Sequence, residues 1–413
     1  MPQPDRQPAK SGCDLALRFA TTRAMSEALV APLSDADATL QSMDDASPAK
    51  WHLAHPTWFW ETFLLRDHAP GYRLYREDWP FLFNSYYEVE GARLARGSRG
   101  LLSRPTLDEV REWRVHVDAA MEPLLADAAL TPLIELGIAH EQQHQELLLT
   151  DIKHALFHNP LGPAMWLPEG NSEREADGGT DSWHQHPGGI AMIGHGGNAF
   201  AFDNEGPRHR VLLEPFALSA RLVTNGAWDS FIADGGYNEA RLWLSDGWAW
   251  VQREGIAAPL YWRDGEQFTH AGWQPRDINA PVTHISFYEA DAFATWAGAR
   301  LPTEFEWEAI AQAHDPAVGN QLDEARAPMP RGGTQLFGDC WQFTRSAYLP
   351  YPRFAPAEGA VGEYNGKFMS GQVVLRGASC ATVRGHSRAS YRNFFYPHQR
   401  WQFTGVRLAK DLA

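Results

Sequence analysis

The chain has 413 residues, 44% of them hydrophobic, which suffices for a sizeable core and suggests two or three domains. Its formal net charge of −15 argues against a broad phosphate-binding surface, so we expect small-molecule partners and no nucleic acid. The first dozen residues are polar and no apolar run reaches the length of a membrane span, so neither export nor a membrane partner is expected. The oligomeric state does not follow from the sequence. Widely spaced cysteines favour a reducing cytoplasm over a disulfide framework: Cys13, Cys340 and Cys380.

The first 160 residues carry the signals of four helices. One is predicted over 14–33, and Ser47-Pro48 marks a second, because proline is favoured in the first turn after a capping residue. Thr106 and Glu109 form a capping-box pattern at the start of a third. The fourth is predicted over 131–158, with apolar and histidine side chains recurring at helical spacing. Its expected buried face consists of Leu133, Leu136, His140, His144, Leu147 and Leu148.

The composition changes near Trp183, where glycine, tryptophan, tyrosine and aspartate become frequent and apolar runs become short. Two helical patterns remain in that half, at 287–297 and 303–312. We therefore expect an α+β protein in which a helical bundle precedes an irregular, loop-rich domain. The expected boundaries are 1–168 for the bundle, 169–189 for a polar linker and 190–413 for the second domain.

Histidines on two predicted helices indicate a metal site. His140 and His144 are four residues apart and therefore share one helix face, which points into the bundle. The second helix adds His52 and His55, followed by Pro56 at an interior helical position. Metal sites in helical bundles are built in this way, from side chains that face one another across the core.

The segment His140-Glu141-Gln142-Gln143-His144 also fits the HExxH pattern of zinc peptidases. Glu141 would then be the general base, and a third ligand would follow downstream. The extended HExxHxxGxxH form is absent because position 150 is threonine, although Glu169 is a candidate ligand. An all-histidine site leads to different chemistry, since three neutral ligands leave the metal charge uncancelled and leave positions open for anionic ligands and O2. Iron is the metal that we expect there.

Four motifs give the chain a resemblance to the ergothioneine sulfoxide synthase (EgtB) family. They are Trp-His-Leu-Ala-His at 51–55, Phe-Asn-Ser-Tyr-Tyr-Glu at 83–88, His-Glu-Gln-Gln-His-Gln-Glu at 140–146 and Tyr-Arg-Asn-Phe-Phe at 391–395. The N-terminal half is similar to DinB-type four-helix bundles. The segments 281–308 and 404–408 resemble the formylglycine-generating enzyme, which has a C-type-lectin-like fold.

The resemblance implies an enzyme that uses Fe(II) and O2 to join a thiol sulfur to the imidazole carbon of hercynine, producing the sulfoxide of ergothioneine biosynthesis. Iron would be held by His55, His140 and His144, with His52 beside the site. A phenol near the metal delivers a proton, a role that falls to Tyr86 or Tyr87. The second domain would complete the substrate pocket. The implied substrate contacts are Arg96, Gln143, Asn393, Phe394 and Phe395.

The identity of the sulfur or selenium donor stays open. Phe395 stands where family members that use γ-glutamylcysteine carry an acidic residue, so it resembles members that accept free cysteine. Selenoneine synthase, which joins selenium from a selenosugar to hercynine, has similar motifs and is the main alternative. A zinc peptidase and a thiol transferase of the DinB type are further alternatives.

Overall fold

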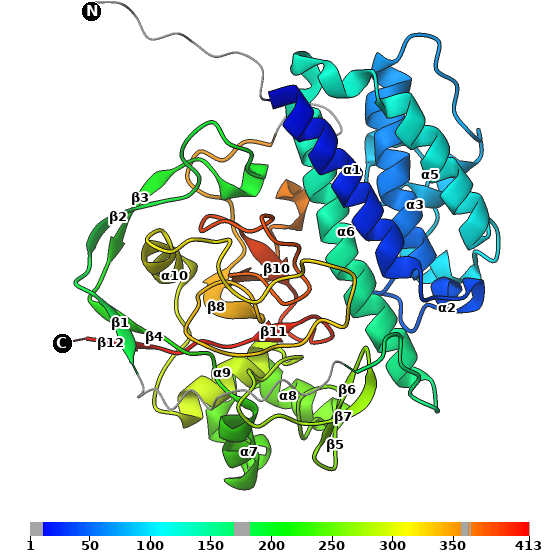
Figure 1. Ribbon diagram of the computed structural model, residues 1–413. Helices are drawn as coiled ribbons and strands as arrows, with labels where there is room; N and C mark the ends of the chain where they lie inside the picture. Colours follow the sequence, from blue (N-terminus) through cyan, green and yellow to red (C-terminus); the bar gives the residue numbers. More distant parts are fainter. Residues whose placement is uncertain (1–10, 169–181, 357–361, 363–364, 413) are drawn as a thin grey trace, which may run out of the picture. The chain divides into compact units, whose positions relative to one another are not determined.

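The computed structural model describes residues 11–168, 182–356, 362 and 365–412. Contacts divide the chain into two compact units, Met1–Ile152 and Lys153–Ala413. The first unit is helical, and the second combines helices with short strands, so the predicted α+β class is confirmed (Figure 1).

Four long helices dominate the N-terminal half, as predicted. They lie side by side in Figure 1 and are α1 (Ser11–Val30), α3 (Ala49–Phe59), α5 (Leu107–Met121) and α6 (Thr131–His158). The capping box at α5 is confirmed, because the Thr106 hydroxyl accepts from the Glu109 amide while the Glu109 carboxylate accepts from the Thr106 amide. The buried stripe of α5 fills the space between the helices with Val110, Trp113, Val117 and Met121.

Two short helices lie between the long ones, and neither was predicted. They are α2 (Asp35–Thr39) and α4 (Trp79–Phe83), each only five residues long. The helix α4 and two single 3₁₀ segments, Glu88–Glu90 and Arg96–Leu101, lie within the long connection between α3 and α5. That connection is therefore ordered, as expected for a long loop that contributes to a functional site.

Helix α3 changes its hydrogen-bonding pattern after Pro56. Proline has no amide hydrogen and cannot make the usual bond to the carbonyl four residues earlier. The chain continues without a break into a π-helical segment, Trp60–Arg66, and the Trp60 amide donates to the carbonyls of Pro56 and Thr57. Such wide turns are often found beside functional residues, and this one follows His55 by five positions.

The described residues of the second unit form four small sheets. Their strand orders are β1-β4-β12, β10-β9-β8-β11, β2-β3 and β5-β6-β7, and all pairs are antiparallel except β11 with β8. The strands are β1 (Trp183–His186), β2 (Gly189–Ile193), β3 (His209–Leu213), β4 (Phe216–Ser219), β5 (Trp262–Arg263), β6 (Glu266–Thr269), β7 (Gly272–Pro275), β8 (Trp341–Ala347), β9 (Val373–Arg376), β10 (Asn393–Phe395), β11 (Thr404–Gly405) and β12 (Ala409–Asp411).

Four helices accompany these sheets: α7 (Asn225–Ala233), α8 (Ser245–Glu254), α9 (Phe287–Trp296) and α10 (Glu304–Ala311). The helices predicted at 287–297 and 303–312 are thus confirmed, whereas α7 and α8 were not predicted. Helix α10 places Trp307 in a core cluster with Phe216, Leu218 and Phe337.

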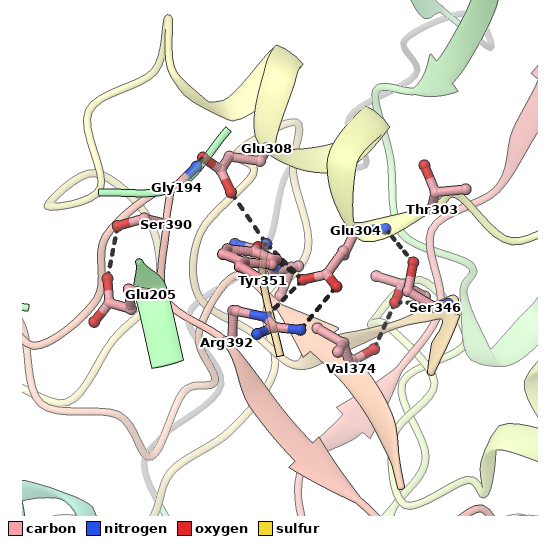
Figure 2. Close-up of polar contacts among 12 residues, drawn as sticks. Gly194, Glu205, Thr303, Glu304, Glu308, Ser346, Tyr351, Val374, Ser390 and Arg392 are labelled. Atoms are coloured by element: carbon pink, nitrogen blue, oxygen red, sulfur yellow. Dashed lines mark hydrogen bonds and ion pairs between the residues drawn. The ribbon is translucent and has the colours of Figure 1, made fainter. Parts of the chain in front are cut away.

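A buried ionic network links α10 to strand β9 and to Arg392, the residue just before β10 (Figure 2). The Glu304 carboxylate accepts from Arg376 at 2.8 Å, from Arg392 at 2.8 and 3.0 Å, and from the Tyr351 hydroxyl at 3.1 Å. Arg376 also forms an ion pair with Glu308 at 3.0 Å. Burial opposes ionisation of Glu304, but the two guanidinium groups hold its pKa below the ordinary value. The network is therefore charged and depends on every member being paired.

The contact boundary between the units falls within α6, before position 168. From Lys153 onward the helix belongs to the second unit, where the Lys153 amine lies 2.8 Å from His284 Nε2 and over the rings of Tyr261 and Phe403. Burial lowers the pKa of Lys153 to about 7. Most of the expected linker, 169–181, lies outside the described residues. Within the described part of the chain, no helix combines the length and apolar character needed to cross a bilayer.

Candidate metal centre

His55, His140 and His144 meet in the helical unit. One nitrogen from each ring lies within 4.8 Å of the others, and the three side chains are buried. No other group of metal-ligating side chains with this geometry occurs among the residues that the structure describes. Helix α3 supplies His55 and α6 supplies the other two, so the predicted trio is brought together by two facing helices.

The orientation of His55 is fixed from both faces and from its edge. Its ring is stacked between Trp51, at 4.6 Å between centroids, and Trp58, at 5.4 Å. His55 Nδ1 donates to the Phe83 carbonyl at 2.6 Å, which leaves the lone pair on Nε2. Within the described residues this buried Nε2 has no hydrogen-bond partner. A metal ion would satisfy it.

His144 has a different support. Its Nδ1 lies 2.9 Å from Nδ1 of His52, whose Nε2 lies 3.0 Å from Oδ2 of Asp151. Both nitrogens of His52 are therefore engaged within the protein, so His52 lies beside the trio and is not part of it.

Burial makes the three histidines neutral ligands. It lowers the pKa of His140 to about 3, and burial together with the neighbouring histidines lowers the pKa values of His55 and His144 well below the usual range. Neutral imidazole is the form that binds a metal. The site therefore presents three nitrogen donors without competition from protons near neutral pH.

Glu141 is committed elsewhere, which argues against its role as the general base of a zinc peptidase. Its Oε1 accepts from Ser26 at 2.7 Å and from Arg114 at 3.0 Å, and its Oε2 accepts from Arg23 at 3.0 Å and from Trp60 at 2.9 Å. Burial opposes ionisation, but the two guanidinium groups hold the pKa of Glu141 far below its ordinary value. This carboxylate holds α1, α5, α6 and the π-helical segment Trp60–Arg66 together.

We expect Glu141→Gln to lower the free energy of unfolding by about 3 kcal/mol, because it leaves two buried guanidinium groups without their shared negative charge. The folded variant should retain its affinity for a divalent metal. Urea unfolding and metal titration measure the two effects. The control is Glu135→Gln, which removes a partly exposed partner of Arg18 and should cost less than about 1 kcal/mol. Loss of metal binding in the folded Glu141 variant would contradict the structural assignment.

Tyr86 and Tyr87, in the long connection between α3 and α5, lie close to the tryptophans that stack on His55. Tyr87 is fully buried, with its ring centroid 5.5 Å from that of Trp58, and Tyr86 stacks on it at 5.1 Å. Asn84 holds the turn, because its side-chain amide donates to the Tyr87 carbonyl while its oxygen accepts from the Tyr87 amide. Burial raises the pKa of Tyr86 to about 12, so this phenol keeps its proton at neutral pH.

The arginines of the same connection differ in exposure. Arg96 is exposed, and its guanidinium makes a 3.5 Å contact with the Asp45 carbonyl. Arg99 is buried over the Trp51 ring, 3.4 Å from its centroid, and donates to the hydroxyls of Ser47 and Ser85. Arg99 is therefore a structural residue that packs behind Trp51. Arg96 is exposed enough to bind an anion from solution.

The remaining predicted substrate residues divide between the units. Gln143 is half-buried on α6, next to His144. Asn393, Phe394 and Phe395 form the half-buried edge strand β10 of the second unit. Within that unit Phe394 stacks on Tyr348 at 4.1 Å between ring centroids. The first unit therefore carries Gln143, and the second unit carries Asn393, Phe394 and Phe395.

Sequence reasoning missed two contributors to the metal centre. The Phe83 carbonyl is a backbone group, and a backbone group has no residue-type signature. Asp151 had a detectable signal, because it lies seven residues after His144 and so shares its helix face. A carboxylate on the face that carries two metal ligands is a natural outer partner for them.

Comparisons with known proteins agree with this architecture. The family model of the DinB superfamily matches residues 18–158, and that of the sulfatase-modifying factor enzyme 1-like domain matches residues 185–330. A hercynine oxygenase of Mycobacterium tuberculosis is 34% identical over 96% of this chain and 99% of its own length. Another, from Mycolicibacterium smegmatis, is 35% identical over 89% and 91% of the respective chains. The ergothioneine biosynthesis protein 1 of Schizosaccharomyces pombe is 28% identical over 51% of this chain and 28% of its own.

Proposed function

The chain belongs to the hercynine oxygenase family, and we propose that it is a non-heme Fe(II) enzyme that uses O2 to join a thiol sulfur to the imidazole carbon of hercynine. The product is the sulfoxide intermediate of ergothioneine biosynthesis. The observation that carries the proposal is the buried trio of His55, His140 and His144 in a chain that matches these oxygenases over almost its full length. Its buried cysteine thiols, Cys340 and Cys380, are in keeping with a reducing cytoplasm as the place of action.

The three histidines fit Fe(II). All are neutral nitrogen donors, and three of them leave coordination positions and the full metal charge for other ligands. Bound iron supplies the activation of O2 and the acidification of the thiol. The protein's own contribution is to orient His55 through the Trp51 and Trp58 stacks, to hold His144 through His52, and to bury all three rings away from water.

Proton delivery is assigned to Tyr86 and Tyr87, in the turn that Asn84 holds. The phenol of Tyr86, which burial keeps protonated, or that of Tyr87 would supply a proton at the site and so favour carbon–sulfur bond formation over simple oxidation of the thiol. Arg96 is assigned to a carboxylate of the thiol donor, and Gln143 and Asn393 to the carboxylate of hercynine. The aromatic faces of Phe394 and Phe395 are assigned to its trimethylammonium group, since such a group has no N–H with which to donate a hydrogen bond.

Product analysis tests the function. The Fe(II)-loaded protein is offered hercynine with cysteine, γ-glutamylcysteine or a selenosugar in parallel, and products are identified by mass spectrometry while O2 uptake is recorded. We expect a hercynine–thiol sulfoxide with one of the two thiols. Product from the selenosugar alone would make the protein a selenoneine synthase. Absence of substrate-dependent O2 uptake with all three donors would contradict the proposal.

We expect Tyr87→Phe to shift the products from the sulfoxide toward thiol dioxygenation by about 100-fold, because the phenol that donates the proton is missing. Tyr86→Phe identifies which of the stacked phenols acts. Tyr75→Phe is the control, because this ring packs on Trp79 and carries no assigned chemistry. If the product ratio is unchanged in both variants, the tyrosines have no catalytic role.

A further inference from the structure

We propose that His52 and Asp151 form a positioning pair that fixes the tautomer and the orientation of His144, so that its Nε2 lone pair faces the metal. This role rests on the proposed metal site. It assigns a function to a histidine that is not a ligand and to a carboxylate seven residues beyond the HEQQH segment.

The direction of the hydrogen bonds from His144 to His52 and from His52 to Asp151 follows from the Asp151 carboxylate, which ends the series. Oδ2 of Asp151 lies 3.0 Å from Nε2 of His52, and an ionised carboxylate can only accept, so Nε2 of His52 carries the hydrogen. Nδ1 of a neutral His52 is then a lone pair. Nδ1 of His144 lies 2.9 Å away and must donate to it, which places the remaining lone pair of His144 on Nε2.

Asp151 is itself held in place. Its Oδ2 also accepts from the Ser47 amide at 2.8 Å, just before α3 begins, and the Ser47 hydroxyl accepts from Arg99 at 2.8 Å. Asp151 and His52 are both 5% exposed, so water does not compete for these bonds. The pair therefore anchors a ligand of α6 to the first turn of α3.

The pair also explains why two of the three ligands need different supports. His55 reaches the backbone carbonyl of Phe83, which accepts from its Nδ1. His144 has a side-chain acceptor in the corresponding place. An outer carboxylate that orients a metal-bound histidine is a recurrent device, and its removal typically weakens metal binding 10- to 100-fold. Here the imidazole of His52 lies between the carboxylate of Asp151 and the histidine that it orients, His144.

The test separates hydrogen bonding from packing with two substitutions at one position. His52→Phe retains a ring but removes the acceptor, whereas His52→Gln removes the ring but provides an amide oxygen that can accept from Nδ1 of His144. Co(II) dissociation constants and visible Co(II) spectra are measured without substrate, and thermal unfolding verifies folding. We expect His52→Phe and Asp151→Ala to bind Co(II) 10- to 100-fold more weakly, with altered spectra, and His52→Gln to be within a few-fold of the native protein.

The controls distinguish this proposal from the one on which it rests. His116→Phe, at an exposed position of α5, should leave Co(II) binding unchanged. If the native protein binds no Co(II), or if His140→Ala binds it equally well, the metal site itself is contradicted. If His140→Ala abolishes binding but His52→Phe binds with the native affinity and spectrum, only the positioning role is overturned. A Gln variant weaker than the folded Phe variant would likewise overturn it, because ring packing would then explain the effect.

Discussion

Replacing His55, His140 or His144 by alanine should each abolish Fe(II) binding at micromolar metal. Structural zinc sites in zinc-finger peptides bind with roughly 10–16 kcal/mol shared among their ligands, so by analogy the loss of one of only three protein ligands is expected to weaken binding by about 100- to 1000-fold. The three nitrogens lie within 4.8 Å of one another, so the three variants should behave alike. Metal content after dialysis and Fe(II) titration provide the measurement.

Two other histidines provide the controls for this experiment. His158→Ala, at the exposed end of α6, should bind Fe(II) as the native protein does. His52→Ala should show an intermediate affinity, because in the proposed site His52 hydrogen-bonds to the ligand His144 and is not itself a ligand. If His52→Ala loses the metal as completely as His55→Ala, the assignment of the third ligand is wrong.

Arg376→Met should have the largest effect on stability in the second unit, lowering its free energy of unfolding by about 3–5 kcal/mol. The arginine is fully buried between Glu304 and Glu308, so its removal leaves buried carboxylates with too little positive charge. Methionine fills much of the same volume, which limits the contribution from lost packing. Urea unfolding followed by tryptophan fluorescence measures the change.

Arg384→Met is the matched control for this prediction. Arg384 pairs with Asp323 through two short hydrogen bonds, but both side chains are partly exposed and solvent screens the pair. Its loss should cost less than about 1 kcal/mol. Equal destabilisation by the two substitutions would show that burial of the network is not what makes Arg376 important.

The long helices were predictable because their signals are local. Thr106 and Glu109 identify the start of α5, and the periodic apolar residues of α6 identify a helix that continues to His158. Helix α8 was missed although its Gly255 adopts the left-handed conformation that ends many helices, because Trp248 and Trp250 lie among glycine and aspartate in a turn-like composition. The pairing of β11 with β8 joins residues more than sixty positions apart, and no local pattern specifies it.

The pair His140 and His144 was predictable from spacing, because the two residues share a helix face, whereas the choice of His55 over His52 came from the family resemblance. The supports of the trio were not predictable. Which nitrogen of His55 faces the metal depends on a carbonyl from α4, and the non-ligand role of His52 depends on where α6 places Asp151. Both depend on tertiary packing, which brings together residues that the sequence separates by tens of positions.

The bond from His55 to the Phe83 carbonyl has a consequence for the behaviour of the enzyme. Phe83 ends α4, and the next residue, Asn84, ties down the turn that carries Tyr86 and Tyr87. The proposed metal ligand and the proposed proton-donating phenols are thus attached to the same few residues of backbone. A disturbance of the turn, such as Asn84→Ala, should alter the ligand field of the metal as well as the supply of protons. Variants selected for a new product ratio should therefore show changes in metal affinity even when no histidine has been touched.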